Sequence, residues 1–493
     1  MKLGDLIMGV EVAQARGGID VEISGLAYDS RKAKAGTLFF CVPGEKADGH
    51  EFATAAVEAG AVALVVEREL DLDVTQLIVP DARVAMAPLA ARFWGDPTAG
   101  LRVVGVTGTN GKTTTAFLIR EILEATGVHC GLLGTVSQVV GGVEERAERT
   151  TPEAIDLQAI FRRMLEGGDR VCAMEVSSHA LALHRCDEID FEVALFTNLS
   201  QDHLDFHADM EDYFLAKRKL FAMGPKTAIV NVDDLHGARL AAEFECLTFS
   251  AKGGAADFAA GEASFDAAGA EFTTSLSMGL KPAYISGDRP INGTVRVQTA
   301  LPGEFNVSNA LAAFAAAVAL GVEPEQAATG LARAERVPGR FEAVEEGQPF
   351  AVLVDYAHTP DSLENVLLAA RRITAGRLIA VFGAGGDRDR DKRPKMGRAG
   401  AQLADLAVVT SDNPRSETPE AIIAEILAGI DDREGVEVEP DRRAAIALAL
   451  ASAKPEDTVV IAGKGHEQGQ EFENGRKVPF DDREVAREEL RKL

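Results

Sequence analysis

Cysteine is scarce in this chain, and its spacing matches no common redox or metal motif. The 493 residues contain five cysteines, an odd number, and none forms a C-x-x-C pair. This pattern argues against a disulfide framework and against a structural zinc cluster, and it fits a reducing cytoplasm. The five are Cys41, Cys130, Cys172, Cys186 and Cys246.

Positive charge is also in short supply. The chain has 51 Lys and Arg against 77 Asp and Glu, which gives a formal net charge of -26 at pH 7. Nucleic-acid binding needs clustered positive charge, so this balance argues against nucleic acid as a partner and favours a solvated, soluble surface. An anionic ligand has to be held by local lysines, arginines and helix N-termini.

Long apolar runs are missing as well. No segment approaches the roughly 18 apolar residues that a membrane helix needs. The N-terminal stretch MKLGDLIMGVEVAQARGG lacks the apolar core of a signal peptide. We therefore expect no membrane association and a cytoplasmic location.

The pattern of predicted helices and strands changes twice along the sequence, and the length of the chain corresponds to about three domains. Residues 1–98 contain short strand-like runs and one helix–strand pair, FATAAVEAG followed by AVALVVE. Residues 99–335 follow the linker-like segment GDPTAG, and within them the Gly-, Ala- and Thr-rich residues 251–300 predict antiparallel strands. Residues 336–493 form the third block. The central block also holds the strand-like runs VCAMEV (171–176), VALFTNL (193–199) and TAIVNV (227–232).

The third block alternates strand and helix patterns most regularly. Helical patterns such as SLENVLLAARRI separate four apolar runs, which predicts right-handed crossovers and a parallel, doubly wound sheet. Ligands of such sheets bind beyond the C-terminal ends of the strands. Polar clusters follow all four runs: DYAHTPD, GAGGDRDRDKRP, SDNPRSETP and GKGHE. The sequence therefore predicts a ligand-binding rim. The four runs are residues 351–356, 378–383, 406–411 and 458–463.

The stretch GVTGTNGKTTT, residues 105–115, indicates a phosphate site. It lies between an apolar strand pattern and an amphipathic helix pattern. Gly108 and Gly111 let the backbone approach an anion, Lys112 supplies positive charge, and Thr113 offers a hydroxyl to magnesium. The spacing is one residue tighter than G-x-x-x-x-G-K-[ST]. The alternative is a glycine turn with an exposed lysine.

Three further motifs follow in the central block. EVSSH (175–179) ends a strand pattern, so Glu175 could reach a magnesium ion beside the phosphate loop; the alternative is a surface loop. In TNLSQDHLDFH (197–207), His203 could bind metal or cap a helix. In YFLAKRKLF (213–221), Lys217 lies on an amphipathic helix whose second lysine, Lys219, is expected to face solvent.

Together these motifs resemble the Mur ligase family over essentially the whole chain. The motifs occur in the order found in the family. The first four are GTNGKTT, EVSSH, TNLSQDHLDFH and Y-x-x-x-K, and they are followed by PGEFNVSNALAA, VPGRFE, DYAHTPD, GDRD and GKGHE. The resemblance implies a three-domain α/β fold. Its parts are an N-terminal UDP-binding α/β domain, a central P-loop ATPase-like domain with a parallel sheet, and a C-terminal doubly wound, Rossmann-like domain.

Within the family, the motifs are most similar to those of the enzymes that make UDP-N-acetylmuramoyl tripeptide. This implies an ATP-dependent ligase of peptidoglycan precursor synthesis. A carboxylate is phosphorylated to an acyl phosphate, and an incoming amine then displaces phosphate, with catalysis by positioning and charge neutralisation. The expected catalytic residues are Lys112, Glu175, His203 and Lys217.

The resemblance also implies a modified lysine and magnesium. The lysine that corresponds to Lys217 is carbamylated by carbon dioxide to N6-carboxylysine, which supplies the oxygen that magnesium prefers. Two magnesium ions are expected, with Thr113, Glu175, His203 and the Lys217 carbamate as ligands. The residues expected to bind ATP are Gly108, Thr109, Asn110, Gly111, Lys112, Thr113, Thr114, Asn306, Arg340, Asp355 and His358.

The first block is similar to the uridine-nucleotide domain of these enzymes through YDSR (28–31) and GEKADGH (44–50). The UDP-sugar peptide is polyanionic, and Arg185 suits it because a guanidinium can bind a carboxylate or a phosphate through two parallel hydrogen bonds. Some relatives carry Gln two residues before this Arg, where this chain has Leu183, so one substrate hydrogen bond is in doubt. The residues expected to bind the UDP-sugar peptide are Ser30, Glu45, Lys46, Ala47, Thr150, Thr151, Ser177 and Arg185.

The motif DNPR, residues 412–415, implies meso-diaminopimelate as the amino acid that is added. Diaminopimelate has a second carboxylate where lysine has none, and Arg415 can pair with it; the alternative is an Arg that caps a loop. Asp412 and Glu467 suit ammonium groups, and Arg388 suits a carboxylate. The residues expected to bind the amino acid are Arg388, Asp412, Asn413, Pro414, Arg415, Gly463 and Glu467.

Other interpretations stay open at this point. They are a lysine-adding enzyme of the same fold, a folylpolyglutamate synthase-like ligase, a P-loop ATPase or kinase acting as a switch, and a non-enzymatic nucleotide-binding module. The expected partners are small molecules: UDP-N-acetylmuramoyl-L-alanyl-D-glutamate, meso-diaminopimelate and ATP. We expect a monomer.

Overall fold

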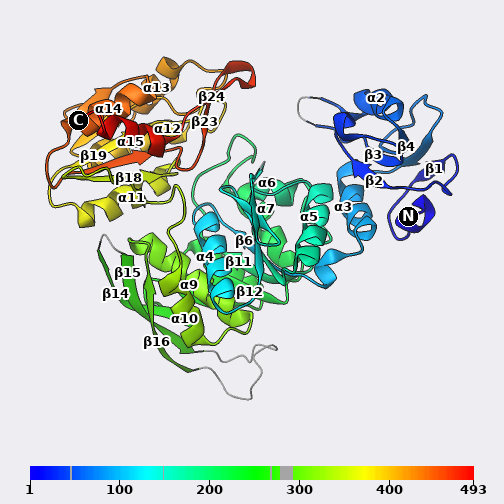
Figure 1. The fold of residues 1–493 in the computed structure, drawn as a ribbon, viewed down its shortest axis with the longest axis horizontal. Helices are drawn as coiled ribbons and strands as arrows, with labels where there is room; N and C mark the ends of the chain where they lie inside the picture. The colour runs from blue at the N-terminus through cyan, green and yellow to red at the C-terminus, as the bar shows by residue number, and fades with distance from the viewer. Residues whose placement is uncertain (45–46, 148, 267–268, 278–291) are drawn as a thin grey trace. The chain divides into compact units, whose positions relative to one another are not determined.

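The computed structural model describes residues 1–44, 47–147, 149–266, 269–277 and 292–493, and it is mixed α/β with parallel-rich sheets (Figure 1). The described chain forms two compact units. The first comprises Met1–Gly105 and His129–Glu192, and the second comprises Val106–Val128 and Val193–Leu493. The expected α/β fold class is confirmed.

The N-terminal part of the first unit is a five-stranded sheet in the order β1-β5-β4-β3-β2, parallel except for β1. The expected helix–strand pair is present as α2 and β4, because AVALVV is apolar enough to be buried in the sheet. The elements are α1 Leu3–Leu6, β1 Gln14–Arg16, β2 Gly25–Ala27, β3 Thr37–Phe40, α2 Ala53–Glu58, β4 Ala61–Val66, β5 Thr75–Ile78 and α3 Ala82–Phe93.

The rest of the first unit carries the expected strand 171–176 as β10, which pairs in parallel with β7. An antiparallel ribbon, β7-β8-β9, follows. Helix α5 ends at Gly167, and the following residue, Gly168, caps it with a φ of 95°, a left-handed conformation that glycine tolerates. The elements are β7 Cys130–Leu133, β8 Gln138–Val140, β9 Val143–Glu145, α5 Ala154–Gly167, β10 Val171–Glu175 and α6 Ser178–Ala182, with β6 Arg102–Thr107 and β11 Phe191–Phe196 leading into the second unit.

The second unit begins at Val106 with the phosphate loop and the helix that follows it, and it continues with parallel strands β11 to β14. Strands β14, β15 and β16 pair antiparallel, which confirms the prediction for residues 251–300 within the described part of that range. Helix α9 is apolar and buried all round. The elements are α4 Lys112–Ala125, α7 Met210–Ala222, β12 Thr227–Asn231, α8 Leu235–Glu243, β13 Leu247–Ser250, β14 Phe258–Asp266, β15 Gly269–Ser277, β16 Asn292–Thr299, α9 Glu304–Ala319 and α10 Pro324–Arg333.

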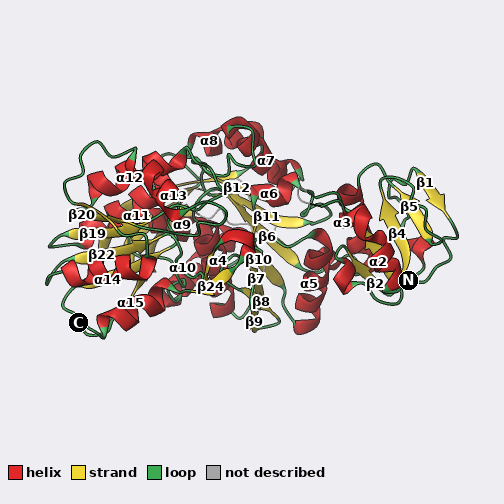
Figure 2. Ribbon diagram, turned by 90° about the horizontal axis from the view of Figure 1, so that it is seen from above, coloured by secondary structure: helices red, strands yellow, loops and turns green. Residues whose placement is uncertain are grey.

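The C-terminal part of the second unit is the predicted doubly wound sheet, in the order β17-β18-β22-β19-β20-β21, parallel except for β17. Helices α11, α12 and α13 cover one face, and α14 and α15 cover the other (Figure 2). The elements are β17 Glu342–Ala343, β18 Ala351–Asp355, α11 Pro360–Ile373, β19 Leu378–Phe382, α12 Lys392–Leu403, β20 Leu406–Val409, α13 Pro419–Leu427, β21 Val436–Val438, α14 Arg442–Ser452, β22 Thr458–Ala462, β23 Gly469–Glu471, β24 Lys477–Pro479 and α15 Asp482–Leu490.

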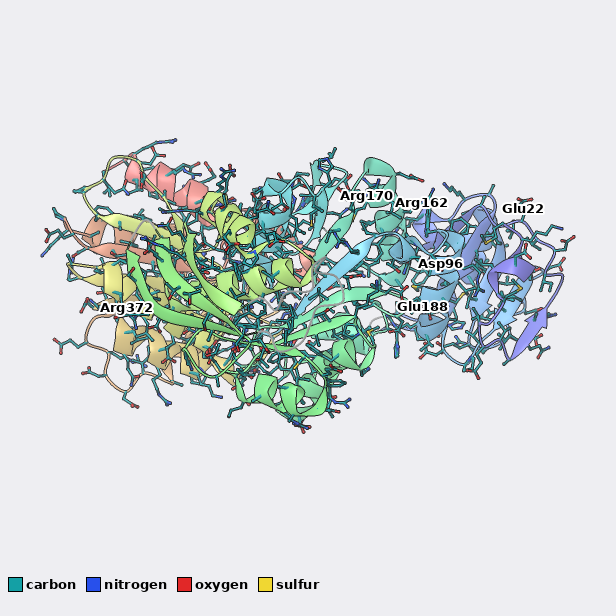
Figure 3. The ribbon with its side chains drawn as sticks, turned by 90° about the horizontal axis from the view of Figure 1, so that it is seen from below. Glu22, Asp96, Arg162, Arg170, Glu188 and Arg372 are labelled. Atoms are coloured by element: carbon teal, nitrogen blue, oxygen red, sulfur yellow. The ribbon has the colours of Figure 1, made fainter. Side chains whose placement is uncertain are left out.

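Charged side chains project from the surface of both units, as Arg162 and Glu188 do in the first and Arg372 does in the second (Figure 3). All five cysteines are free thiols, and four of them are buried. Within the described ranges, no helix has both the length and the apolar character needed to cross a membrane.

Candidate active site

The phosphate loop connects β6 to α4, and both of its glycines are needed for the local fold. Gly108 has a φ of 149°, and a Cβ there would lie 1.9 Å from the Thr197 hydroxyl. Gly111 has a φ of 86°, and a Cβ there would lie 2.3 Å from Asn309 Oδ1. Helix α4 begins at Lys112, so its N-terminus adjoins the loop and provides the dipole that favours an anion.

Two lysines converge on the loop carbonyls. Lys112 Nζ donates to Gly108 O at 3.0 Å and to Thr109 O at 2.7 Å, and Lys217 Nζ donates to Gly108 O at 2.8 Å. Lys217 is fully buried on α7, whereas Lys219 is exposed, as predicted. Burial and the positive charge of Lys112 hold the pKa of Lys217 well below its ordinary value. A lowered pKa favours the neutral amine of Lys217.

His203 lies beside a buried carboxylate. Its φ is 57°, and its Nε2 is 3.4 Å from Asp202 Oδ2. Asp202 also lies 3.5 Å from Lys392 Nζ and 3.7 Å from His358 Nε2. Burial raises the pKa of Asp202, but these positive groups outweigh it and hold the pKa well below the ordinary value. Helix α7 is capped by Asp209, so His203 is not its cap.

Arg340, one of the expected nucleotide residues, contacts the start of α4 directly after the phosphate loop. Arg340 Nη2 donates to Thr113 Oγ1 at 2.9 Å, and its guanidinium lies 4.6 Å from the Tyr356 ring centroid. Asp355 ends β18 and accepts the backbone N–H groups of Phe341 and Ala357. Burial raises the pKa of Asp355. This carboxylate is a buried acceptor held at the strand end.

Asn306 and a second asparagine form a buried polar pair in α9. Asn309 Nδ2 donates to Asn306 Oδ1 at 3.1 Å, and Asn306 Nδ2 donates to Pro302 O at 2.9 Å. The Asn309 amide oxygen faces Gly111 of the phosphate loop. Asn309 was not among the expected residues, although two asparagines three residues apart in an Ala-rich helix pattern could have indicated it.

The strand ends of the C-terminal sheet meet as the predicted rim. Lys464 Nζ donates to Asn413 Oδ1 at 2.8 Å and to Glu467 Oε2 at 2.9 Å, and Asn413 Nδ2 donates to Glu467 Oε2 at 2.9 Å. Asp412 Oδ2 is buried without a hydrogen-bond partner among the described residues, and a Cβ at Gly463 would lie 2.5 Å from it. This orphan oxygen suits a ligand ammonium group.

The two arginines expected to bind the amino acid lie on adjacent rim loops. Arg415 donates from Nη1 to Gly386 O at 2.7 Å and from Nε to Glu471 Oε2 at 3.0 Å. Arg388 is half exposed, and its Nη1 lies 3.4 Å from Asp205 Oδ2. Pro414 is buried between Asn413 and Arg415. The rim thus offers guanidinium, carboxylate and amide groups together, which suits a zwitterionic ligand.

The first unit gathers its own set of expected residues. Thr151 Oγ1 donates to Glu175 O at 2.9 Å and accepts the Ser177 N–H at 3.1 Å, and Arg185 Nη1 donates to Thr151 O at 3.2 Å. Thr150 contacts Thr135, whose N–H donates to Glu175 Oε1 at 2.7 Å. Arg185 also pairs at 2.8 Å with Glu153, a carboxylate that was not among the expected site residues.

The expected uridine residues are described only in part. Ser30 begins a short 3-10 helix that Asp29 caps, and the Ala47 carbonyl accepts the Gly44 N–H at 3.0 Å. Glu45 and Lys46 lie outside the described residues.

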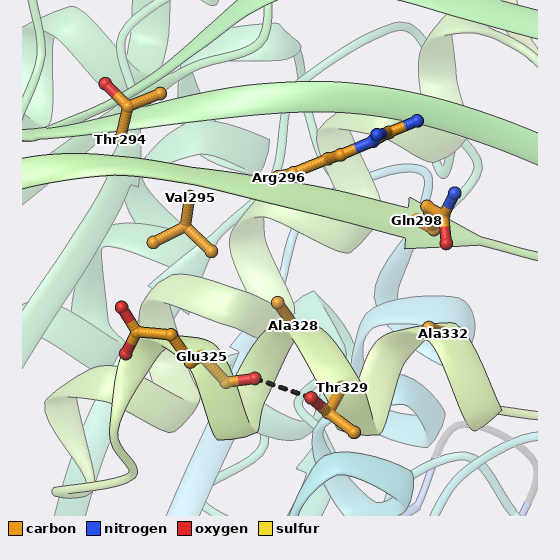
Figure 4. Close-up of a pocket in the computed structure, with 8 residues that line it drawn as sticks. All are labelled: Thr294, Val295, Arg296, Gln298, Glu325, Ala328, Thr329 and Ala332. Carbon is orange, nitrogen blue, oxygen red and sulfur yellow. Dashed lines mark hydrogen bonds between the residues drawn. The ribbon is translucent and has the colours of Figure 1, made fainter.

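A hollow of about 360 Å³ between β16 and α10 contains none of the expected site residues (Figure 4). Its lining includes the Glu325 carbonyl, which accepts the Thr329 hydroxyl at 2.7 Å (Figure 4). Nothing in its lining suggests a ligand.

Three family models match the chain. They are described as "Mur ligase family, catalytic domain" at residues 22–94, "Mur ligase middle domain" at residues 106–317, and "Mur ligase, glutamate ligase domain" at residues 339–465.

The relatives of this chain include proteins named UDP-N-acetylmuramoyl-L-alanyl-D-glutamate–2,6-diaminopimelate ligase. The protein from Syntrophomonas wolfei is 47% identical over 501 residues, which cover 100% of this chain and 99% of the relative. The protein from Streptomyces coelicolor is 47% identical over 487 residues, which cover 96% and 93%.

Solved structures also match the chain. The structure of a ligase with this same name matches with a TM-score of 0.68 and 33% identity, covering 100% of this chain and 99% of that one. Mycobacterium tuberculosis folylpolyglutamate synthase, complexed with ADP and AMPPCP, matches with a TM-score of 0.61 and 18% identity. That match covers 78% of this chain and 92% of the synthase, and it shows the fold alone.

Proposed function

The chain belongs to the Mur ligase family, and we propose that it joins meso-diaminopimelate to UDP-N-acetylmuramoyl-L-alanyl-D-glutamate with ATP as co-substrate. The observation that carries this proposal is full-length similarity, at 47% identity, to ligases named for that reaction. The reaction belongs to peptidoglycan precursor synthesis in the cytoplasm, and the proposed enzyme works as a monomer on small molecules.

Transfer of the γ-phosphoryl group converts the donor carboxylate to an acyl phosphate, and the amine of the acceptor then displaces phosphate. Lys112, at the N-terminus of α4, neutralises phosphate charge. The phosphate loop, Asn306, Arg340, Asp355 and His358 hold the nucleotide. Phosphoryl transfer of this kind depends on positioning, because the protein supplies no covalent intermediate of its own.

The donor set fits magnesium only if Lys217 is carbamylated. Magnesium prefers oxygen ligands, and an unmodified lysine offers none. Lys217 is buried beside the phosphate loop with its pKa lowered, so its neutral amine is available to react with carbon dioxide. Within the second unit, Thr113, His203 and the carbamate would then hold the ion, which neutralises charge on the phosphates when bound. Glu175 lies in the first unit, and its part in this ligand set stays a prediction.

Donor and acceptor bind through different parts of the chain. Thr150, Thr151, Ser177 and Arg185 hold the muramoyl peptide, and Ser30 with residues 45–47 holds the uridine diphosphate. The acceptor binds at the C-terminal rim. There Arg415 and Arg388 pair with its carboxylates, while Asp412 and Glu467 receive its ammonium groups. The orphan Asp412 Oδ2 beside Gly463 supports this assignment.

The reaction is tested by its product. Purified protein is incubated with the UDP-muramoyl dipeptide, meso-diaminopimelate, ATP and magnesium, and the mixture is examined by mass spectrometry. We expect one new nucleotide-linked tripeptide whose formation requires all four components. Formation of ADP without this product would contradict the proposal.

A further inference from the structure

Arg393 is a fully buried arginine behind the proposed acceptor rim. It is the second residue of α12, and its side chain has no exposed surface. Its guanidinium grips Glu417 with two bonds, Nη2 to Oε1 at 2.7 Å and Nη1 to Oε2 at 2.8 Å. It also donates to Glu425 at 2.8 Å and to the Gly385 carbonyl at 3.1 Å. Fork-to-fork pairing of this kind fixes geometry as well as charge.

Glu417 connects this guanidinium to both loops that carry the acceptor arginines. Glu417 lies two residues after Arg415 in the DNPRSE loop. Its Oε1 also accepts the backbone N–H of Asp387, the residue before Arg388, at 2.8 Å. One carboxylate therefore ties the loop of Arg415 to the loop of Arg388, and Arg393 holds that carboxylate in place.

The two loops have conformations that need such support. Asp387 has a φ of 52° and Arg415 a φ of 51°, a left-handed region that residues with side chains rarely adopt. Gly386 N–H donates to Asn413 O at 2.9 Å, and the Ser416 hydroxyl donates to Asp387 Oδ1 at 2.5 Å. The arrangement sets how far apart the two acceptor arginines lie and where they point.

We propose that Arg393, acting through Glu417, is a positioning residue that sets the spacing of Arg388 and Arg415 for the two ends of the acceptor. This inference rests on the proposed function. Arg393 does not touch the acceptor itself; its effect is on the geometry of the residues that do. Misplacing a binding group by about 1 Å is enough to cost an enzyme roughly a hundredfold in rate.

Glu425 provides a control that separates an effect on the positions of the acceptor arginines from an effect on the stability of the fold. It is the second carboxylate on Arg393 and lies on α13. Among the described residues it also pairs with the exposed side chain of Arg390, two residues after Arg388, but it accepts no backbone N–H from either acceptor loop. Removing either carboxylate weakens the same buried ion cluster. Of the two carboxylates on Arg393, Glu417 is the one that also accepts the Asp387 backbone N–H, so disturbing its two-bond pairing with Arg393 also disturbs the loop of Arg388.

The test compares Glu417→Gln, Glu425→Gln, Arg393→Lys and the surface control Arg390→Gln, which loses only an exposed partner of Glu425. The readouts are KM for diaminopimelate, KM for ATP, the ratio of diaminopimelate to lysine use, and the thermal midpoint. We expect Glu417→Gln and Arg393→Lys to raise KM for diaminopimelate at least about tenfold and to lower its preference over lysine, with KM for ATP nearly unchanged.

Glu425→Gln is expected to lower the thermal midpoint as much as Glu417→Gln does while leaving KM for diaminopimelate nearly unchanged. Equal rises in KM for both glutamate variants, or no rise for either, would overturn the inference. If Arg393→Lys does not fold, the comparison of Glu417→Gln with Glu425→Gln tests the inference by itself. A wild-type protein that makes no tripeptide refutes the proposed function instead, so the two failures are distinguishable.

Discussion

The side-chain amide of Asn110, in the phosphate loop, donates a hydrogen bond of 2.7 Å to the Asp361 carboxylate in the first turn of α11. The two residues are 251 positions apart in the sequence. Asp361 also lies 3.4 Å from the Ser200 hydroxyl. Asp361 thus holds the loop expected to bind the ATP phosphates against α11, a helix that covers the C-terminal sheet.

Asp361→Ala is expected to raise KM for ATP about five- to tenfold, because Asn110 loses an acceptor that is worth about 1–1.5 kcal/mol. Asp361→Asn keeps an acceptor oxygen in place. Burial raises the pKa of Asp361, so a neutral side chain at this position is not expected to destabilise the fold. Steady-state kinetics with varied ATP measures the effect, and equal KM values for Asp361→Ala and wild type would contradict it.

Lys217→Ala is expected to abolish ligase activity, because the carbamate oxygen is lost, while Lys219→Ala on the exposed side of the same helix retains activity. Intact-mass measurement in bicarbonate should show the added mass of one carbon dioxide on wild type and on Lys219→Ala, but not on Lys217→Ala. A short carboxylic acid should restore part of the activity of Lys217→Ala. Undiminished activity of that variant would refute the assignment.

Asp202 and Lys392 form a buried pair at 3.5 Å, with about 8% and 4% of their side chains exposed. Removing one partner leaves an uncompensated charge, so Lys392→Met is expected to lower the free energy of unfolding by about 3 kcal/mol. Chemical denaturation measures this loss. The double variant Asp202→Asn with Lys392→Met should recover part of it, and additive losses would show that the pair is not coupled.

The stability of the protein at acid pH is expected to depend on the Arg393–Glu417 pair. The side-chain hydrogen bond from Arg393 lowers the pKa of Glu417 from 4.5 to about 2. A carboxyl group whose pKa falls on folding stabilises the fold above its unfolded pKa, and the contribution is lost as pH falls through the folded pKa. The difference in thermal midpoint between wild type and Glu417→Gln should therefore be largest above about pH 5 and shrink between pH 4.5 and 2.

Glu420→Gln, an exposed change on α13, serves as the matched control and should show no such trend. A difference for Glu417→Gln that stays constant with pH would contradict the expectation.

The regular part of the fold could be predicted because buried parallel strands are continuous apolar runs. β18, β19, β20 and β22 all lie within the predicted ranges, and the rim followed from their polar C-terminal ends. The short edge strands β17 and β21 were missed. Their residues, EA and VEV, are too few and too polar to show a periodicity.

The site was predicted where local motifs carry the chemistry and missed where distant residues complete it. The glycines, Lys112 and the buried Lys217 follow from motifs or from the family resemblance. Asp361 and Arg393 each lie in a helix and look like ordinary polar surface residues until the fold brings their partners to them. The roles of the expected ligand-binding residues stay predictions.

The central claim is the identity of the acceptor, and phosphate release from ATP tests it most directly. The purified protein with UDP-N-acetylmuramoyl-L-alanyl-D-glutamate is compared in the presence of meso-diaminopimelate, L-lysine and no amino acid. We predict release only with diaminopimelate. Release only with lysine would contradict the role given to Arg415, and equal release in all three would contradict the ligase assignment and favour a regulatory ATPase.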